Sequence, residues 1–163
     1  FMGFPDAGKS SLLNAVTRAK ARVSAYPFTP LEPNLGELFG FILADIPGLI
    51  EGASEGKGLG HKFLRHIRRT RLLIHCISLE TEDISKSYAA IREELSAYDE
   101  DLARKPELLV LTKTDVVSEA DLAQKVAEAA KLNPDVFTVT ILDDISLKAF
   151  EDSLMKRFRE LIR

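Results

Sequence analysis

Residues 3–10 read Gly-Phe-Pro-Asp-Ala-Gly-Lys-Ser, and their types and spacing are those of a loop that binds phosphate groups. Gly3 and Gly8 allow a tight turn that brings backbone N–H groups close to phosphate oxygens. Lys9 supplies a positive charge for the outer phosphates, and the Ser10 hydroxyl is a ligand type for Mg²⁺. Apolar positions at helical spacing follow, so we expect the loop to open a helix whose N-terminus adds further N–H groups. A chance glycine-rich turn is the competing interpretation, and the motifs further along the chain weaken it.

A second motif lies where an apolar segment ends. Residues 37–44 have an apolar second half that leads into Asp45-Ile46-Pro47-Gly48. In nucleotide-binding sites, an aspartate at the end of an apolar strand, just before a glycine turn, supplies the carboxylate that faces the metal ion. Eight residues scarcely hold the two strands and the hairpin expected here. Either the hairpin is very short or its tip is missing from the sequence.

A third motif, Thr112-Lys113-Thr114-Asp115, follows the apolar residues 107–111. The Asp115 carboxylate can accept two hydrogen bonds, one from the guanine ring N–H and one from the exocyclic amine. Adenine has no such donor pair on that edge, so an ATPase is disfavoured. Lys113 would lie along the base and brace the loop. In this order and after buried strands, the three motifs predict a guanine-nucleotide site.

Strand-like and helix-like segments alternate along the chain, which positions these motifs at strand ends. We expect strands at residues 72–79, 107–111 and 136–142, and helices at residues 9–18, 61–70, 83–101 and 118–132 and along the apolar stripe from Leu147 to Leu161. The pattern predicts an α/β fold of the P-loop NTPase type, with a mostly parallel central sheet and helices on both faces. In such folds ligands bind at the carboxyl ends of the strands.

Two segments beside the site have the composition of loops. Residues 19–36 contain three prolines after position 26, which excludes a regular helix. Residues 49–60 contain four glycines among small and charged residues, as in segments that order with ligand state. We interpret residues 19–36 and 47–60 as two switch segments that report nucleotide state.

A basic segment follows the second switch. Its positively charged residues and histidines are His61, Lys62, Arg65, His66, Arg68, Arg69 and Arg71. A solvated helix face is the ordinary interpretation of such a cluster, and contact with RNA or a partner is the alternative.

Composition narrows the remaining possibilities. The 163 residues predict one domain, and 45% hydrophobic with 29% charged residues is ordinary for a globular protein. A net charge of −3 argues against bulk electrostatic binding of nucleic acid. The single cysteine, Cys76, is expected to be a buried structural thiol, and His75 a core histidine with its hydrogen bonds satisfied. No apolar run reaches transmembrane length.

Three further stretches carry a family resemblance. Residues 26–36 (Tyr-Pro-Phe-Thr-Pro-Leu-Glu-Pro-Asn-Leu-Gly), residues 45–53 (Asp-Ile-Pro-Gly-Leu-Ile-Glu-Gly-Ala) and residues 58–67, together with the phosphate loop, closely resemble the G domain of Obg-type GTPases. The resemblance implies slow GTP hydrolysis and a role in assembly of the large ribosomal subunit. It also implies binding of GTP and GDP, of the large ribosomal subunit or its rRNA as partner, and a cytoplasmic location without a membrane span.

Residues 1–163 are therefore expected to be one Obg-type G domain with a truncated first strand, lacking the flanking Obg and C-terminal domains. The candidate catalytic residues are Lys9, Ser10, Thr29 and Gly48, and the candidate Mg²⁺ ligands are Ser10, Thr29 and Asp45. The candidate nucleotide-binding residues are Gly3, Phe4, Pro5, Asp6, Ala7, Gly8, Lys9, Ser10, Ser11, Phe28, Thr29, Asp45, Pro47, Gly48, Thr112, Lys113, Asp115, Thr140 and Ile141.

The sequence departs from the family pattern near the phosphates. The family usually has Thr-Thr where this chain has Thr29-Pro30, and Pro30 offers neither a hydroxyl nor an N–H to the metal or the γ-phosphate. Thr29 would substitute only after a one-residue shift. Asp6 stands where many relatives have an asparagine that holds K⁺, so a K⁺ ion beside Asp6 is a further hypothesis. Leu49 follows Gly48 in place of a water-orienting glutamine, which predicts slow turnover.

Two more departures concern the base. Thr112 replaces the asparagine that opens the family's guanine motif, and a hydroxyl can make part of the same tie to the phosphate loop. Thr140-Ile141 is a poor match to the Ser-Ala that closes over the base. Together with Pro30 and Leu49, the poor match at Thr140-Ile141 motivates an alternative function. The chain would then be a guanine-nucleotide-binding switch module with little or no hydrolysis of its own.

Overall fold

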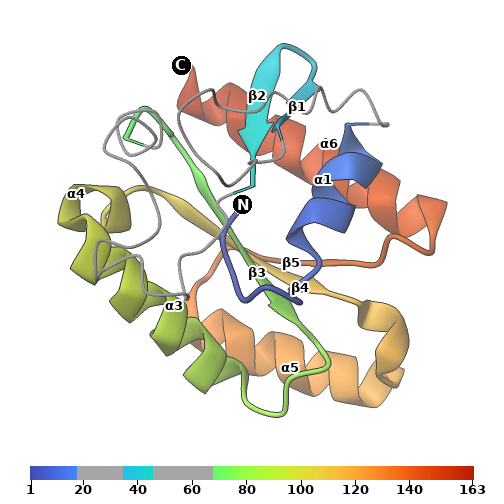
Figure 1. Ribbon diagram of the computed structural model, residues 1–163. Coiled ribbons are helices and arrows are strands. Elements are labelled where there is room, and N and C mark those ends of the chain that lie inside the picture. Colours follow the sequence, from blue (N-terminus) through green and yellow to red (C-terminus); the bar gives the residue numbers. More distant parts are fainter. Residues whose placement is uncertain (18–34, 46–67) are drawn as a thin grey trace.

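The computed structural model of the chain describes residues 1–17, 35–45 and 68–163, which form an α/β fold (Figure 1). In chain order its elements are α1 (Lys9–Val16), β1 (Leu35–Leu38), β2 (Phe41–Ala44), β3 (Leu73–Ser78), α3 (Ile84–Tyr98), α4 (Glu100–Ala103), β4 (Glu107–Thr112), the 3₁₀ turn η2 (Thr114–Val116), α5 (Glu119–Leu132), β5 (Val136–Val139) and α6 (Asp144–Leu161).

The central sheet is parallel. Its three strands run in the order β3-β4-β5, with Cys76 opposite Val110 and Leu111 opposite Thr138. Met2 extends this sheet beyond β3, because its N–H donates to the oxygen of Ile74 and its own oxygen accepts from the N–H of Cys76, both over 2.8 Å. The chain therefore enters the phosphate loop directly from a residue that is paired with the sheet.

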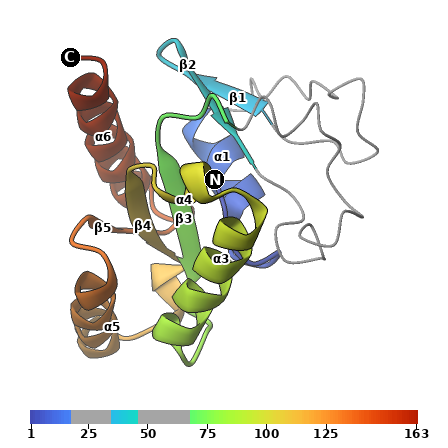
Figure 2. The ribbon, with the colours of Figure 1, turned by 90° about the vertical axis from the view of Figure 1, so that its left-hand side faces the viewer.

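Helices cover both faces of this sheet, as the sequence predicts (Figures 1 and 2). Side chains of β4 alternate between the two faces: Leu108 and Val110 pack with α1 and α6, whereas Leu109 and Leu111 pack with the start of α3 and with α5. Both sets are fully buried, which explains why β4 is apolar from Leu108 to Leu111. The predicted fold class is confirmed.

Strands β1 and β2 form a separate antiparallel pair. Leu38 pairs with Phe41, so only Phe39 and Gly40 form the turn, with φ angles of 48° and 85°. Two central residues with positive φ are the geometry of the tightest hairpins. The expectation of a very short hairpin holds, and two residues assigned to the preceding loop, Leu35 and Gly36, belong to β1.

Several predicted boundaries were wrong for local reasons. The helix expected over residues 83–101 ends at Tyr98, because Asp99 adopts an extended conformation and its side chain caps α4 by accepting from the N–H groups of Asp101 and Leu102. The strand expected over residues 136–142 ends at Val139. Residues 68–70, expected to end a helix, form a turn. The helix over residues 118–132 is confirmed, with Ser118 as its N-cap.

Other predicted features lie outside the described residues. They are residues 19–34 of the first switch segment, the whole second switch segment (47–60) and the first seven residues of the basic segment (61–67). The candidate site residues Phe28, Thr29, Pro47 and Gly48, and the departures Pro30 and Leu49, are among them. Among the described helices, none is both long enough and apolar enough to cross a membrane.

Candidate functional site

The loop between Met2 and α1 has the backbone geometry that phosphate binding requires. Gly3 has a φ of 149°, and a Cβ at this position would lie 2.3 Å from the backbone oxygen of Cys76. Gly8 has a φ of 78° and precedes α1 without any side-chain cap, and the first turn of α1 carries no acidic residue. The N–H groups at the start of α1 are therefore left for an anion to accept.

Lys9 lies under this loop. Its side chain is buried, and its ammonium donates to the backbone oxygens of Gly3 and Phe4 over 3.0 and 2.9 Å. An ammonium has three N–H donors, so one remains for a phosphate oxygen once these two are used. The two carbonyl groups hold the charge of Lys9 at the loop.

The two described candidates for metal binding contact each other. The Ser10 hydroxyl donates to Oδ2 of Asp45 over 2.7 Å, and Asp45 follows directly after β2. The other carboxylate oxygen, Oδ1, is buried and has no hydrogen-bond partner among the residues that the structure describes. Within residues 1–17, 35–45 and 68–163, no group of three or more His, Cys, Asp or Glu could hold a metal alone. The pair fits Mg²⁺, which takes one or two protein oxygens and completes its shell with water and phosphate.

A pocket of about 250 Å³ lies beside the loop, on the side of β4 and β5. It brings together the five residues predicted to hold the base, which come from two separate parts of the sequence: Thr112, Lys113 and Asp115, and Thr140 and Ile141. Its lining residues are Gly8, Ser11, Leu12, Glu80, Thr112, Lys113, Asp115, Val116, Val139, Thr140, Ile141 and Leu142. The position of Gly8 and Ser11 in this lining makes the pocket continuous with the phosphate loop.

Hydrogen bonds fix the polar side chains of this pocket. The Thr112 hydroxyl donates to the backbone oxygen of Ala7 over 2.7 Å, which is the tie to the phosphate loop that the sequence predicts. The Thr140 hydroxyl donates to Oδ1 of Asp115 over 2.6 Å and orients that carboxylate. β5 ends early because Thr140 turns out of the sheet, where its N–H donates to the Ser146 hydroxyl.

Sequence reasoning missed Glu80. It follows β3 by two residues, and its Oε2 accepts from the Lys113 ammonium over 2.6 Å. This contact holds the pKa of Glu80 below its usual range. Lys113 itself has a φ of 59° and lines the pocket. The only signal available in the sequence was an acidic residue just beyond a buried strand.

His75 and Cys76, two of the buried residues of β3, have structural roles. Nδ1 of His75 lies 2.9 Å from Oε1 of Glu107, and its ring stacks on Tyr88. Its Nε2 is buried without a partner in the described part of the chain, so there the expectation of a satisfied histidine is only half right. Burial lowers the pKa of His75 and raises the pKa of the Cys76 thiol to about 12. Cys76 is buried, as the sequence predicts.

Comparisons with known proteins identify the family of the chain. The family described as 50S ribosome-binding GTPase matches residues 1–113, which include the phosphate loop, Asp45 and the start of the Thr112 motif. The chain belongs to this GTPase family. Its resemblance to Obg-type G domains is confirmed as well, by the relatives that follow.

Three curated relatives carry the name GTPase Obg. The chain is 44% identical to the one from Porphyromonas gingivalis over 160 residues, which is 95% of the chain and 40% of that protein. It is 48% identical to the one from Desulforudis audaxviator over 149 residues (86% and 35%) and 52% identical to the one from Anaplasma phagocytophilum over 128 residues (76% and 36%). The chain thus spans less than half the length of these relatives.

A solved structure supports the fold alone. The crystal structure of a mutation variant of SsGBP superposes on 98% of the chain and on 54% of its own chain, with a TM-score of 0.63 and 18% sequence identity.

Proposed function

We propose that this chain is an Obg-type G domain that binds GTP and GDP with Mg²⁺ and hydrolyses GTP slowly to GDP and phosphate. Its family membership and its identity to GTPase Obg proteins support the proposal. The observation that carries it is the hydrogen bond from Thr112 to Ala7, because it joins the base pocket and the phosphate loop into one site.

Asp115 would read the base. Its Oδ1 is held by the Thr140 hydroxyl, and each carboxylate oxygen has two lone pairs, so acceptor capacity remains for the ring N–H and the amine of guanine. Lys113, paired with Glu80, would lie along the base plane. Ile141 and Leu142 are largely exposed at the pocket rim and would give the base an apolar edge.

The phosphates would lie on the N–H groups of the loop and of α1, with the Lys9 ammonium donating to an outer oxygen. Ser10 and Asp45 would hold Mg²⁺, which would neutralise charge that develops on the phosphate oxygens. Water would attack the γ-phosphorus in line with the departing GDP oxygen. Thr29 and Gly48 are proposed to act at this step from the two switch segments. With Leu49 in place of a water-orienting side chain, slow turnover is expected.

Binding and hydrolysis need separate experiments. Direct competition between GDP, GTP and ATP tests base selectivity, and ATP that competes as well as GTP would refute the guanine site. Lys9→Ala should lose most nucleotide affinity, because it removes the one buried ammonium of the loop. Full affinity in that variant would contradict the proposal.

Single-turnover hydrolysis of GTP with Mg²⁺, in KCl and in NaCl at equal ionic strength, distinguishes the enzyme from its alternative. Measurable turnover in either salt supports a GTPase, and faster turnover in KCl supports the K⁺ hypothesis at Asp6. Binding of GTP with no turnover in either salt supports the alternative, a switch module without hydrolysis, which is motivated by Pro30, Leu49 and the pair Thr140-Ile141.

The wider biological role is also a proposal. The relatives' name and the family description motivate a nucleotide switch that acts in assembly of the large ribosomal subunit, in the cytoplasm, on the subunit or its rRNA. Residues 1–163 would supply the G domain of that protein. Cosedimentation with purified large subunits in GTP and in GDP tests the role, and equal binding in both would argue against a switch.

A further inference from the structure

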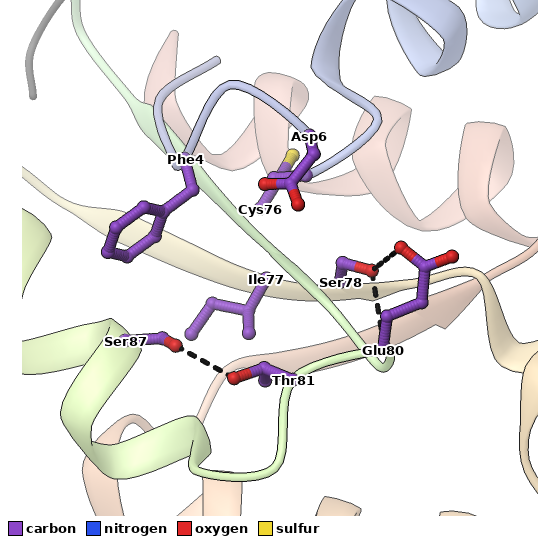
Figure 3. A pocket seen from close by; sticks show the side chains of 9 residues that line it. Phe4, Asp6, Cys76, Ile77, Ser78, Glu80, Thr81 and Ser87 are labelled. Atoms are coloured by element: carbon purple, nitrogen blue, oxygen red, sulfur yellow. Dashed lines mark hydrogen bonds between the residues drawn. The ribbon is translucent and has the colours of Figure 1, made fainter.

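A second pocket lies on the other side of the phosphate loop, between the loop and the first turn of α3 (Figure 3). Its volume is about 270 Å³. In Figure 3, Phe4 and Asp6 reach it from the loop, Ile77 and Ser78 from β3, and Ser87 from α3. The lining residues are Phe4, Asp6, Ala7, Cys76, Ile77, Ser78, Glu80, Thr81 and Ser87.

The size of this pocket limits its occupant. Sites for drug-sized ligands usually measure about 300–1,000 Å³. A pocket at or below the lower end of that range fits a small chemical group.

The charge of the lining selects a cation. Two carboxylates, Asp6 and Glu80, line the pocket, and none of its described lining residues is Lys, Arg or His. Oε2 of Glu80 accepts from Lys113 and from the Ser78 hydroxyl, but within the described residues neither Oε1 of Glu80 nor the Asp6 carboxylate has a hydrogen-bond partner. A cation could therefore bind Oε1 without breaking the pair with Lys113.

The phosphates of a nucleotide do not suit this pocket, since they would face both carboxylates with no basic lining residue to offset them. The N-terminus of α3 does not reverse this preference. It is capped by Asp83, whose carboxylate accepts from the N–H of Lys86 over 2.8 Å.

Apolar groups give the occupant a second feature. The Phe4 ring stands at one side of the pocket with Ile77 beside it (Figure 3). An aromatic ring attracts a guanidinium or ammonium group placed over its face, and an isoleucine side chain favours contact with alkyl groups. The paired hydroxyls of Thr81 and Ser87, 3.2 Å apart, add acceptors on the opposite side.

We propose that this pocket binds an alkylguanidinium or alkylammonium group, held by the carboxylates of Asp6 and Glu80 and by the Phe4 ring. The group belongs either to an arginine or lysine side chain of a partner protein or to a free small amine or guanidine. Because Glu80 also lines the base pocket, the two pockets share one carboxylate.

Butylguanidinium is the probe, and butylurea, which has nearly the same shape without the charge, is its control. Each is titrated into isotope-labelled protein, nucleotide-free and GDP-loaded, while the backbone amide shifts of Asp6, Ile77 and Ser87 are followed. Butylguanidinium should bind saturably with a dissociation constant of roughly millimolar order, as expected for so few atoms. Equal binding of butylurea, or no saturable shifts at these amides, would overturn the proposal.

A matched pair of variants tests the assigned carboxylate. Glu80→Gln should weaken butylguanidinium binding by roughly three- to tenfold, because it removes a charge from a half-exposed group. Glu82→Gln makes the same change on an exposed residue that lines neither pocket, and it should leave binding unchanged. Equal losses in both variants, with matched thermal stability, would refute the role of Glu80.

A third arm distinguishes the sources of the cation. The capped tripeptide Gly-Arg-Gly should bind as tightly as butylguanidinium if the pocket admits a protein side chain, and more weakly if it admits only a free molecule. Amide shifts caused by butylguanidinium in the nucleotide-free protein do not depend on the proposed GTPase function. A protein that does not bind GDP can therefore be distinguished from one whose second pocket does not bind butylguanidinium.

Discussion

The hydroxyl of Thr112 donates to the backbone oxygen of Ala7 over 2.7 Å and thereby joins the end of β4 to the phosphate loop across 105 residues of sequence. Both residues are buried. The contact ties the base pocket to the phosphate loop, so its removal should affect stability and nucleotide binding together.

Thr112→Val tests this contact, because valine keeps the shape and removes the hydroxyl. The buried oxygen of Ala7 would lose its partner, which should lower the free energy of unfolding by about 1–2 kcal/mol. The dissociation constant for GDP should rise by roughly three- to tenfold. Urea unfolding and a fluorescent-GDP titration measure the two effects. Thr138→Val, on the exposed face of β5, is the control and should change neither.

Asp115→Asn tests the reading of the base. An amide nitrogen in place of a carboxylate oxygen removes charge-assisted acceptors and points a donor at the guanine amine. The free energy of GDP binding should weaken by about 3 kcal/mol, which corresponds to a roughly hundredfold rise in the dissociation constant for GDP. Asp101→Asn makes the same change on the exposed surface of α4. Isothermal titration calorimetry with GDP measures the affinity of both variants. Similar affinities of the two variants for GDP would argue against Asp115 as the base-reading residue.

The buried His75 should make stability depend on pH. Burial lowers its pKa in the folded state below the ordinary value of about 6.5, although Glu107 opposes the shift and Arg92 adds to it. Below pH 6.5 the unfolded chain therefore binds a proton that the folded chain excludes, and the free energy of unfolding should fall as the pH falls.

His75→Gln should flatten this dependence between pH 6.5 and pH 5, because glutamine does not titrate and can still donate to Glu107. Urea unfolding at a series of pH values measures it in both proteins. Parallel curves for the two proteins would mean that other groups, such as Glu107 itself, cause the dependence.

Leu109 tests the packing of the α3 and α5 face. It is fully buried in β4, and Leu109→Ala should lower the free energy of unfolding by about 2–5 kcal/mol through lost burial and a residual cavity. Leu142→Ala removes the same atoms from a side chain that is 77% exposed and should change stability by less than about 0.5 kcal/mol. A thermal or urea melt of both variants suffices. Comparable losses would contradict the assigned core.

The sequence by itself determined the fold class and predicted the candidate site residues whose chemistry is tied to fixed spacing. The loop from Gly3 to Ser10 and the Thr112 motif could be found because phosphate and base binding need particular residue types at set distances along the chain. Alternating apolar and amphipathic segments then predicted the parallel sheet. A buried strand is a short continuous apolar run, whereas a helix that covers the sheet has apolar residues at every third or fourth position.

Tertiary structure alone decided the contacts between segments that are distant in sequence. Thr140 looked like a poor match until the end of β5 turned its hydroxyl to Asp115, and Glu80 had no motif that could mark it as the partner of Lys113. Asp99 ended α3 because its side chain caps α4, a choice that local periodicity does not reveal. Such pairings depend on where strand ends meet in space, whereas periodicity and motif spacing act along the chain.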